Sequence, residues 1–305
     1  MGYRVGVDIG GTFTDFCAFN EDTGLVHTLK VLSTPDNPGQ EVVDGIRALE
    51  ARYGVKPCDI MYFTHGTTVG VNSVIQRKGI NLCLFTTAEF EDVLEVARLK
   101  MPDPYDLFSR RAAPLVSREK VFGVRERILF DGSVDEPLDE DSVRTAIQGV
   151  REIGGDGIVI ALLHAYRNPA HERRVAEIVS SEAPELAVTC AGDVWPVIRE
   201  YERTITAVVA GYVQPRVAHY LSAFQDALKS VGVPAEPMLT KSNGGVMTAE
   251  LGKTECAQML LSGTASGVIG AASIARGVKS EATMSLDIGG TSADVAIIRD
   301  GAPQY

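Results

Sequence analysis

Two short segments of the sequence carry residue types that bind phosphate and a divalent cation. DIGGTFTD covers 8–15 and DIGGTSAD covers 287–294, and six of the eight positions are identical. Two adjacent glycines let backbone N–H groups approach a phosphate, and the threonine that follows adds a hydroxyl donor. The leading aspartate and the phosphate are both negative, so Mg²⁺ or its coordinated water must lie between them. Each segment therefore predicts a loop for a magnesium-bound polyphosphate.

A single copy is also compatible with an ordinary hairpin turn, where Asp and Gly are common for conformational reasons alone. Two unrelated turns have no reason to share the same residues in the same register. We therefore favour a pair of phosphate loops that hold one nucleotide from both sides. Asp15 and Asp294 end the two segments, where a carboxylate either holds the hairpin together or polarises water in catalysis.

The elements that must position these loops alternate between strands and helices, which predicts an α/β protein. Residues 3–31 predict three strands joined by glycine turns, and 42–53 a helix. Residues 60–87 predict a strand, a polar turn, a helix and a strand, which together form a βαβ unit. His65, Thr67 and Thr68 lie in that turn, where they either contact a substrate or phosphate or simply satisfy the turn.

The middle of the chain predicts a second α/β segment after an irregular, proline-rich stretch at 100–137. Asp141 is placed to cap the helix that follows, and His171 to cap a later one. Residues 200–231 predict the longest helix, which Gly211 and Pro215 should kink or divide. At its start, a run of charged residues predicts a solvated helix face: Arg199, Glu200, Glu202 and Arg203.

Composition limits the function. The net charge of −11 argues against non-specific binding of nucleic acid. The N-terminus has no signal-peptide pattern and no apolar run reaches 18 residues, so we expect a cytoplasmic protein without a membrane span. The five cysteines are scattered without the spacing of a zinc site or a disulfide framework.

The repeated segment resembles the phosphate loops of the actin-like, sugar-kinase-like and Hsp70-like ATPases, in which two ribonuclease-H-like domains grip ATP. The resemblance implies that Asp8 and Asp287 hold Mg²⁺ through water. It also implies that the loops themselves bind the phosphates of ATP. These loop residues are Gly10, Gly11 and Thr12 in the first copy and Gly289, Gly290 and Thr291 in the second.

The text between the loops is similar to the hydantoinase A/5-oxoprolinase family, which includes acetone and acetophenone carboxylase subunits. The matching segments are THGTTVGVNSVIQRKG (64–79), PLVSR (114–118), ALLHAYRNPAHE (161–172), REYERTITAVVAGYVQP (199–215), KSNGGVM (241–247) and LLSGTASGVIGA (260–271). The resemblance implies ATP-dependent activation of a lactam, hydantoin or ketone carbonyl by phosphoryl transfer. It also implies a hydantoinase B-like partner subunit and an oligomeric assembly.

Within those segments the resemblance places Asn243 near the substrate and Gly263 and Gly267 near the cofactor. A tight turn is the other interpretation of Asn243. The family usually has Pro-Ala-Ala-Gly after the SG pair, whereas this chain has Thr264, Ala265, Ser266 and Gly267.

We expect a first ribonuclease-H-like domain over 1–100, an inserted α/β region over 101–198, a helical connection with a cleft segment over 199–282, and the start of a second ribonuclease-H-like domain over 283–305. Family members are usually more than twice as long, so we expect an N-terminal portion. The favoured function is a component of an ATP-dependent cyclic-amide hydrolase. The alternatives are a ketone carboxylase subunit and a non-catalytic nucleotide-binding or assembly module.

Overall fold

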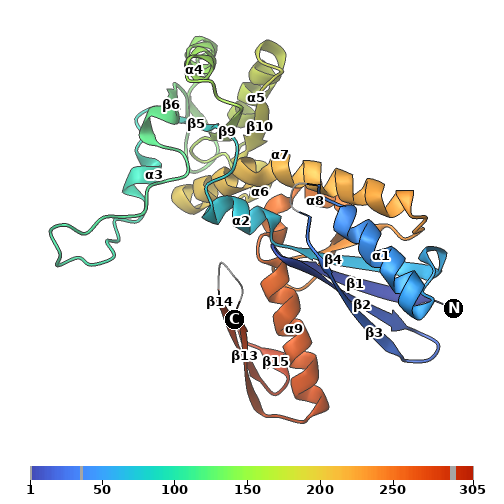
Figure 1. The fold of residues 1–305 in the computed structure, drawn as a ribbon. Coiled ribbons are helices and arrows are strands. Elements are labelled where there is room, and N and C mark those ends of the chain that lie inside the picture. Colours follow the sequence, from blue (N-terminus) through green and yellow to red (C-terminus); the bar gives the residue numbers. More distant parts are fainter. Residues whose placement is uncertain (1, 35–36, 289–292, 305) are drawn as a thin grey trace. The chain divides into compact units, whose positions relative to one another are not determined.

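The computed structural model describes residues 2–34, 37–288 and 293–304, which form two compact units (Figure 1). The first unit combines Met1–Asn72 with Arg216–Tyr305, and the second unit is Ser73–Pro215. The second unit is thus inserted into the chain of the first, as the expected fold class requires. The four domains expected from the sequence, with boundaries near residues 100, 198 and 282, are not the same division as these two compact units. Their boundaries stay a prediction.

A six-stranded mixed sheet forms the centre of the first unit, in the order β12-β11-β4-β1-β2-β3. Strands β1, β2 and β3 are antiparallel neighbours, whereas β4 runs parallel to β1 and β11 parallel to β4. The strands are β1 (Tyr3–Ile9), β2 (Phe13–Asn20), β3 (Val26–Leu32), β4 (Ile60–Thr67), β11 (Pro237–Thr240) and β12 (Val246–Thr248). Three antiparallel strands followed by parallel ones beyond β1 is the ribonuclease-H-like order, so this expectation is confirmed.

Alternation along β1 decides which face of this sheet is buried. Val5, Val7 and Ile9 are buried, whereas Arg4 and Asp8 on the opposite face are exposed. Because side chains of a strand alternate between faces, the apolar residues of β1 pack under the sheet while Asp8 stays accessible.

Two helices cover the buried face: α1 (Gln40–Tyr53) and the C-terminal half of α7 (Glu200–Ser230). Helix α1 approaches β2 closely at Gly45, where an added Cβ would lie 2.2 Å from the Phe16 ring. On α7, Phe224 meets Phe63 of β4 edge to face, with ring centroids 5.8 Å apart. These contacts pack α1 and α7 against the buried face of the sheet and leave its other face exposed.

The first unit also contains a three-stranded meander beside a long helix. Strands β13 (Ala282–Ile288), β14 (Ala293–Arg299) and β15 (Ala302–Pro303) are antiparallel, like β1 to β3. Ala272 and Ala275 of α9 (Ser262–Gly277) pack on Ile298. The helix α8 (Ala249–Thr254) and the 3-10 helix η3 (Cys256–Met259) precede α9. This meander is the expected start of a second ribonuclease-H-like domain.

A four-stranded parallel sheet, in the order β10-β9-β5-β6, forms the centre of the second unit. Its strands are β5 (Leu82–Thr87), β6 (Val121–Val124), β9 (Gly157–Ala161) and β10 (Ala187–Cys190). Every residue of β5 and β9 is buried, as expected for parallel strands covered on both faces. Helices α4 (Glu140–Glu152) and α5 (Ala170–Glu182) pack on this sheet and complete its core.

Short elements complete the chain. They are η1 (Pro57–Asp59), α2 (Val69–Ile75), α3 (Val93–Val96), η2 (Arg118–Lys120), β7 (Arg127–Ile128), β8 (Val134–Glu136) and α6 (Ala191–Val194).

Three sequence expectations about these elements were wrong in part. Strands β4 and β5 belong to different sheets, so 60–87 is not a βαβ unit; the boundary between the two compact units falls within α2. Helix α4 is capped by Asp139 rather than Asp141, because the Asp139 carboxylate accepts from the N–H groups of Asp141 and Ser142. Helix α7 is continuous through Pro215, although the two units divide at that residue.

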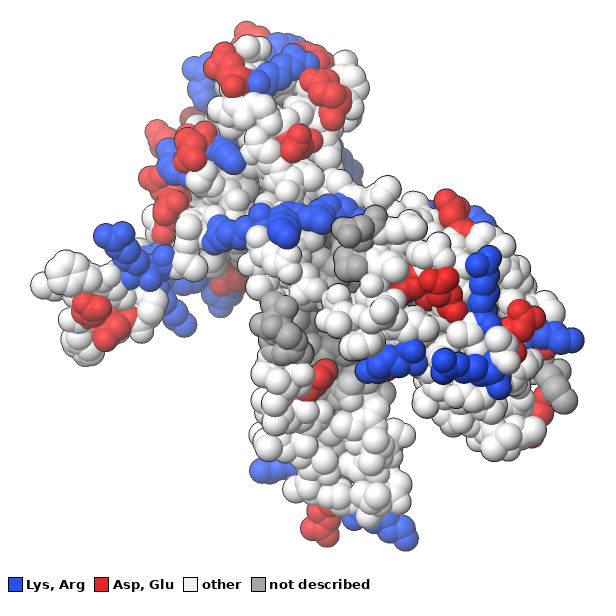
Figure 2. Space-filling model, in the orientation of Figure 1, with Lys and Arg blue, Asp and Glu red and all other residues white. Residues whose placement is uncertain are grey.

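The surface carries both acidic and basic side chains on the face shown in Figure 2. Strands β13 and β14 carry several exposed apolar side chains, namely Met284, Leu286, Ile288, Val295 and Ile297. Within the described residues, no helix has the length and apolar character needed to cross a bilayer.

Candidate phosphate and substrate site

Asp8 lies near the end of β1, directly opposite Asp15 of β2. Both side chains point to the exposed face of the sheet. A lysine on β3 is the nearby positive charge: the Lys30 ammonium is 3.2 Å from Asp15 Oδ2. Both members of this ion pair are more than half exposed, so it contributes little stability.

The pKa of Asp8 is raised above its ordinary value. Partial removal of water from the carboxylate is the main cause, followed by repulsion from Asp15 and Asp287, while Lys30 acts in the opposite direction. Burial and the neighbouring carboxylates therefore make the negative charge of Asp8 less favourable than it is in water, and a nearby cation would offset this cost. Because Asp287 belongs to the second hairpin, the aspartates that begin the two repeated segments interact electrostatically.

The first loop is closed by its own backbone and held from β3. The Gly10 N–H donates to the Phe13 carbonyl at 3.0 Å, which closes the turn. Just past the end of β3, the Ser33 hydroxyl donates to the Gly10 carbonyl at 2.7 Å, and the Ser33 N–H donates to the Thr12 carbonyl at 3.0 Å. Gly11 is exposed, with open space where a Cβ would lie. The loop thus presents its outer side to solvent while Ser33, which sequence reasoning did not identify, holds its inner side.

The second hairpin repeats the register of the first. Asp287 pairs with Asp294 and Ile288 with Ala293, as Asp8 pairs with Asp15 and Ile9 with Thr14. The repeat in the sequence is therefore also a repeat in backbone geometry. The predicted loop residues Gly289, Gly290 and Thr291 lie outside the described residues.

The first turn of α9 lies beside Asp8. Ser262 fixes it there, because its hydroxyl lies 3.2 Å from both the N–H and the carbonyl oxygen of Thr67 at the end of β4. A Cβ added to Gly66 would lie 3.7 Å from both an Asp8 carboxylate oxygen and the Gly263 Cα. Because Gly66 and Gly263 have no side chain, the backbones of β4 and α9 can both approach the Asp8 carboxylate closely.

The remaining predicted residues of α9 lie in its first two turns. The Thr264 hydroxyl, where the family usually has proline, donates to Asp294 Oδ2 at 2.9 Å. This contact and the Lys30 pair of Asp15 support a holding role for both terminal aspartates; catalysis by them stays a prediction. Gly267 has open space around the position of a Cβ, and its cofactor contact likewise stays a prediction.

His65 lies on the buried face of the sheet, opposite to Asp8. It is 1% exposed and stacks on Phe224 at 4.7 Å between ring centroids. Burial lowers its pKa to about 4, so the ring is neutral. The Tyr220 hydroxyl donates to Nε2 at 2.6 Å, and Nδ1 faces the Val7 carbonyl oxygen at 3.4 Å. These protein partners support a structural role; the predicted substrate contact gains no support from this geometry.

Of the other predicted substrate residues, Thr67 ends β4, Thr68 follows it directly, and Asn243 lies in a turn between β11 and β12. The Thr67 hydroxyl accepts from the Val69 N–H at 3.2 Å and so starts α2. The Thr68 hydroxyl lies 3.4 Å from the Ile9 carbonyl, and its methyl group lies 3.6 Å from the position of a Gly263 Cβ, so Thr68 belongs to the surroundings of Asp8. Asn243 is exposed and accepts from the Gly245 N–H at 3.0 Å. The structure thus brings Thr68 to the site and leaves Asn243 in its own turn.

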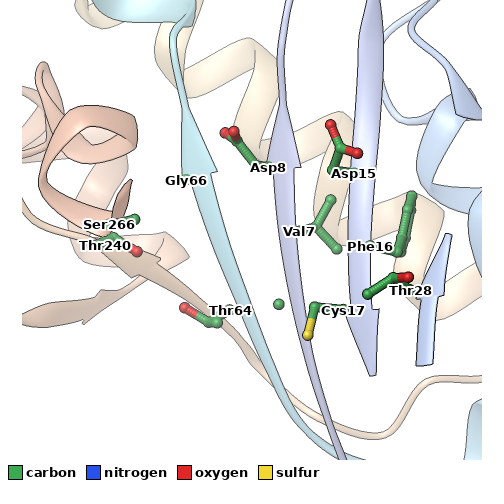
Figure 3. A pocket seen from close by; sticks show the side chains of 11 residues that line it. Val7, Asp8, Asp15, Phe16, Cys17, Thr28, Thr64, Gly66, Thr240 and Ser266 are labelled. Atoms are coloured by element: carbon green, nitrogen blue, oxygen red, sulfur yellow. The ribbon is translucent and has the colours of Figure 1, made fainter. Parts of the chain in front are cut away.

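A pocket of about 340 Å³ opens on the exposed face of the sheet, with the Asp8 and Asp15 carboxylates toward one end (Figure 3). Its lining residues are Gly6, Val7, Asp8, Asp15, Phe16, Cys17, Thr28, Thr64, Gly66, Thr240 and Ser266. Sequence reasoning found the two aspartates and missed the rest. The alternation of side chains along a strand could have identified two more of them. Gly6 lies two residues before Asp8, and Cys17 lies two residues after Asp15, so each shares a face of its strand with that aspartate.

A magnesium ion fits the carboxylates described here only with further ligands. Among the described residues, no three His, Cys, Asp or Glu side chains are grouped so as to hold a metal ion. The pKa of Asp8 is raised first by burial and then by repulsion from Asp15 and Asp287, so a cation would be favourable beside this carboxylate. Asp8 and Asp287 would therefore hold Mg²⁺ together with water and phosphate oxygens, which is the usual preference of this ion.

The second unit contains a separate buried polar cluster that holds loops together. His171 Nδ1 lies 2.7 Å from Glu126, which also accepts from the Thr87 hydroxyl. Glu172 accepts from the N–H groups of Leu162 and Gly192 at 3.1 and 2.9 Å. His171 is thus a buried partner of Glu126 and not the predicted helix cap.

Arg203 corrects another expectation. It is 1% exposed and donates to the carbonyl oxygens of Leu162 and Val197, so it is not part of a solvated helix face. Glu200 and Glu202 of the same run do pair with Arg98 at the surface.

Comparison with known proteins gives matches along the whole chain. A family model described as hydantoinase/oxoprolinase N-terminal region matches residues 4–183, and one described as hydantoinase/oxoprolinase matches residues 203–305. The acetophenone carboxylase gamma subunit of Aromatoleum aromaticum is 32% identical over 96% of this chain and 42% of its own length. The caprolactamase subunit alpha of Pseudomonas jessenii is 31% identical over 99% of this chain and 44% of its own length.

A solved nucleotide-free structure of acetone carboxylase has the same fold, with a TM-score of 0.91 at 30% identity over 100% of this chain and 46% of that one. The chain spans less than half the length of the proteins to which it is compared.

Proposed function

We propose, from the premise that this chain belongs to the hydantoinase/oxoprolinase family, that it is the nucleotide-binding part of an ATP-dependent cyclic-amide hydrolase. The observation that carries the proposal is the pair of hairpins with identical register, whose leading aspartates Asp8 and Asp287 interact. One hairpin alone is explained by turn chemistry. Two hairpins in the same register, whose leading aspartates act on each other electrostatically, are explained by a shared polyphosphate.

The residues of this chain would act mainly by position and charge. The exposed backbone of Gly11 and the first turn of α9 supply N–H groups near Asp8, where they can face phosphate oxygens. Asp8 and Asp287 would hold Mg²⁺ through water, and the ion would neutralise phosphate charge. Such preorganised charge is the main contribution that proteins make to phosphoryl transfer.

The reaction that follows is phosphoryl transfer to a carbonyl oxygen. The amide oxygen forms a bond to the γ-phosphorus of ATP, the bond from that phosphorus to the bridging oxygen breaks, and ADP leaves. The amide N–H proton is lost, which gives an imidate phosphate. Water then adds to the imidate carbon, the carbon–nitrogen bond breaks as the nitrogen takes up the proton of the new hydroxyl, and the ring opens to an acyl phosphate. A second water then adds to the acyl carbon, and phosphate leaves with the former carbonyl oxygen. A hydantoinase B-like partner subunit would complete this second half.

A ketone carboxylase subunit is the second candidate, because the acetophenone carboxylase relative carries that activity in its name. It would use the same phosphoryl transfer to a carbonyl oxygen, with a carboxylation step in place of hydrolysis. A non-catalytic nucleotide-binding module is the third candidate. We expect the working form to be an oligomer that includes the partner subunit, and to function in the cytoplasm.

The proposal predicts that Asp8→Asn and Asp287→Asn each weaken binding of Mg-ATP at least tenfold, about 1.4 kcal/mol, because each removes a carboxylate that holds the ion. Isothermal titration of the full chain with Mg-ATP measures this. The control is Asp44→Asn, which removes an exposed carboxylate of α1 that accepts a hydrogen bond from Gln40 of the same helix. Unchanged affinity in both site variants would contradict the two-loop site.

The enzyme class is tested by phosphate release. The chain with its partner subunit is incubated with Mg-ATP and lactams, hydantoins or ketones. Stimulation by lactams or hydantoins supports the hydrolase, and stimulation by ketones that needs bicarbonate supports the carboxylase. If the chain binds Mg-ATP but none of these compounds stimulates phosphate release, the result supports the non-catalytic nucleotide-binding module.

A further inference from the structure

We propose that the pocket beside Asp8 is a substrate subsite for a small uncharged carbonyl compound, a lactam, cyclic ureide or ketone that bears no carboxylate. This inference rests on the proposed function for the reaction and goes beyond it in naming the place and the charge of the substrate. Three observations carry it: the space above Gly6, the charges of the lining and the hydroxyl groups of the walls.

The pocket owes its depth to Gly6 in the middle of β1. Glycine weakens a strand interior, and where it occurs there it marks a bend, a bulge or the close approach of a ligand or backbone. Gly6 has no positive φ, and an added Cβ would meet Thr64 Cγ2 at 3.6 Å, an ordinary contact. Neither backbone conformation nor packing therefore requires glycine here. Space for a ligand is the remaining reason.

The pocket has the size and wall chemistry of a small-molecule site. Its volume of about 340 Å³ lies within the range of ligand pockets. Gly6 pairs with Cys17 of β2 and with Thr64 of β4, and Cys17 pairs with Thr28 of β3, so one face of four strands supplies the floor. The hydroxyls of Thr28, Thr64 and Thr240 can donate to a carbonyl oxygen.

Charge decides the class of substrate. Two carboxylates line the pocket, and the described residues of its lining include no Lys, Arg or His. The nearby Lys30 is already paired with Asp15. A nucleotide brings its own cation to Asp8, but a substrate carboxylate would meet like charges without a partner. The pocket therefore favours an uncharged ring over an acidic one such as 5-oxoproline.

Two exposed cysteines make this testable without turnover. Cys17 lines the pocket, whereas Cys58 is exposed on η1, away from the lining. Burial raises the pKa of the other three thiols, of Cys83 to about 11 and of Cys190 and Cys256 to about 12, so these react slowly with an alkylating reagent. Alkylation of Cys17 reports occupancy of the pocket, and alkylation of Cys58 is the internal control.

The experiment measures the iodoacetamide rates of both thiols in the full chain by peptide mass spectrometry. The probes are 2-pyrrolidone and 5-oxoproline, which differ only by the carboxylate. We expect saturating 2-pyrrolidone to slow alkylation of Cys17 at least fivefold, with Cys58 unchanged and 5-oxoproline much less effective at equal concentration. Equal protection by both compounds, or by neither, would overturn the inference.

The glycine supplies the matched variants. Gly6→Ala adds a methyl group to the pocket floor without a clash, and we expect it to raise the 2-pyrrolidone concentration needed for protection about tenfold while Mg-ATP affinity stays within twofold. Gly270→Ala, on α9 with open space around it, should leave both unchanged. Unchanged protection in Gly6→Ala contradicts the assignment of the pocket.

The same assay separates this inference from the proposed function. Protection of Cys17 by Mg-ATP alone would assign the pocket to the nucleotide and overturn the substrate subsite, while supporting nucleotide binding. Protection by 2-pyrrolidone in a chain that does not bind Mg-ATP would sustain the subsite and refute the proposed function.

Discussion

At the scale of single residues, burial decides what a titratable side chain can do. Asp8 and His65 lie within one unit, on opposite faces of the same sheet. Asp8 keeps access to solvent and has its pKa raised by partial burial and by its acidic neighbours. His65 is enclosed between Tyr220 and Phe224, and its pKa falls to about 4. The first is poised to receive a cation, and the second is kept neutral as part of the core.

The neutral His65 predicts an acid-dependent loss of stability. Between pH 6.5, its ordinary value, and about 4, the unfolded chain binds a proton at this histidine and the folded chain does not. The free energy of unfolding of the first unit should therefore fall as pH decreases through this range, by at most roughly 3 kcal/mol from His65 alone.

NMR of the histidine ring carbons and nitrogens measures the titration directly. His65→Gln is the companion variant, since glutamine keeps a donor and an acceptor but does not titrate, so this part of the pH slope should vanish. Titration of His65 near 6.5 in the folded chain would contradict the prediction.

At the scale of elements, hairpin register and helix caps show how local sequence becomes geometry. The two repeated segments pair their aspartates in the same register, Asp8 with Asp15 and Asp287 with Asp294. Helix α4 shows a competition between two neighbouring caps. Asp139 has extended backbone and accepts two N–H bonds, whereas Asp141 lies inside the first turn and pairs with Arg144 at the surface.

Asp139→Ala should lower the stability of the second unit by about 1 kcal/mol, because two N–H groups at the start of α4 lose their acceptor. Asp141→Ala is the matched control, and it should cost less than about 0.5 kcal/mol, as expected for an exposed ion pair. Denaturant unfolding of both variants measures the difference. A larger loss from Asp141→Ala would restore the cap inferred from the sequence.

At the scale of the whole molecule, each compact unit has a hydrophobic core of its own. The core of the second unit is built from residues between Cys83 and Leu186. The first unit packs its own buried side chains from β1, β2, α1, β4 and α7. Since buried apolar surface is the main source of stability, we expect the units to open as two cooperative units.

Hydrogen exchange measured by mass spectrometry tests this expectation with one variant in each unit. Gly45→Ala forces a Cβ into the Phe16 ring and should destabilise the first unit by about 1–3 kcal/mol. It should speed exchange in β1, β2 and α1 and leave β5 and β9 unchanged, while Asp139→Ala should do the reverse. Equal acceleration in both units by either variant would show a single cooperative unit.

Much of this molecule follows from the sequence alone. The two aspartate–glycine segments, the α/β class, the long helix and most element bounds depend on residue types and periods that act within a few positions of one another. The ribonuclease-H-like order was expected from the resemblance of the two repeated segments to the phosphate loops of the actin-like ATPases. These features are local, or nearly so.

Tertiary structure decided the rest. That β4 and β5 enter different sheets, that His65 and Arg203 are buried, and that Asp287 acts electrostatically on Asp8 all depend on contacts between residues far apart in the chain. The pocket over Gly6 exists because four strands place Gly6, Cys17, Thr28 and Thr64 on one face. Periodicity shows that each residue has a face, but only the packed sheet determines which face is covered and which stays open for a ligand.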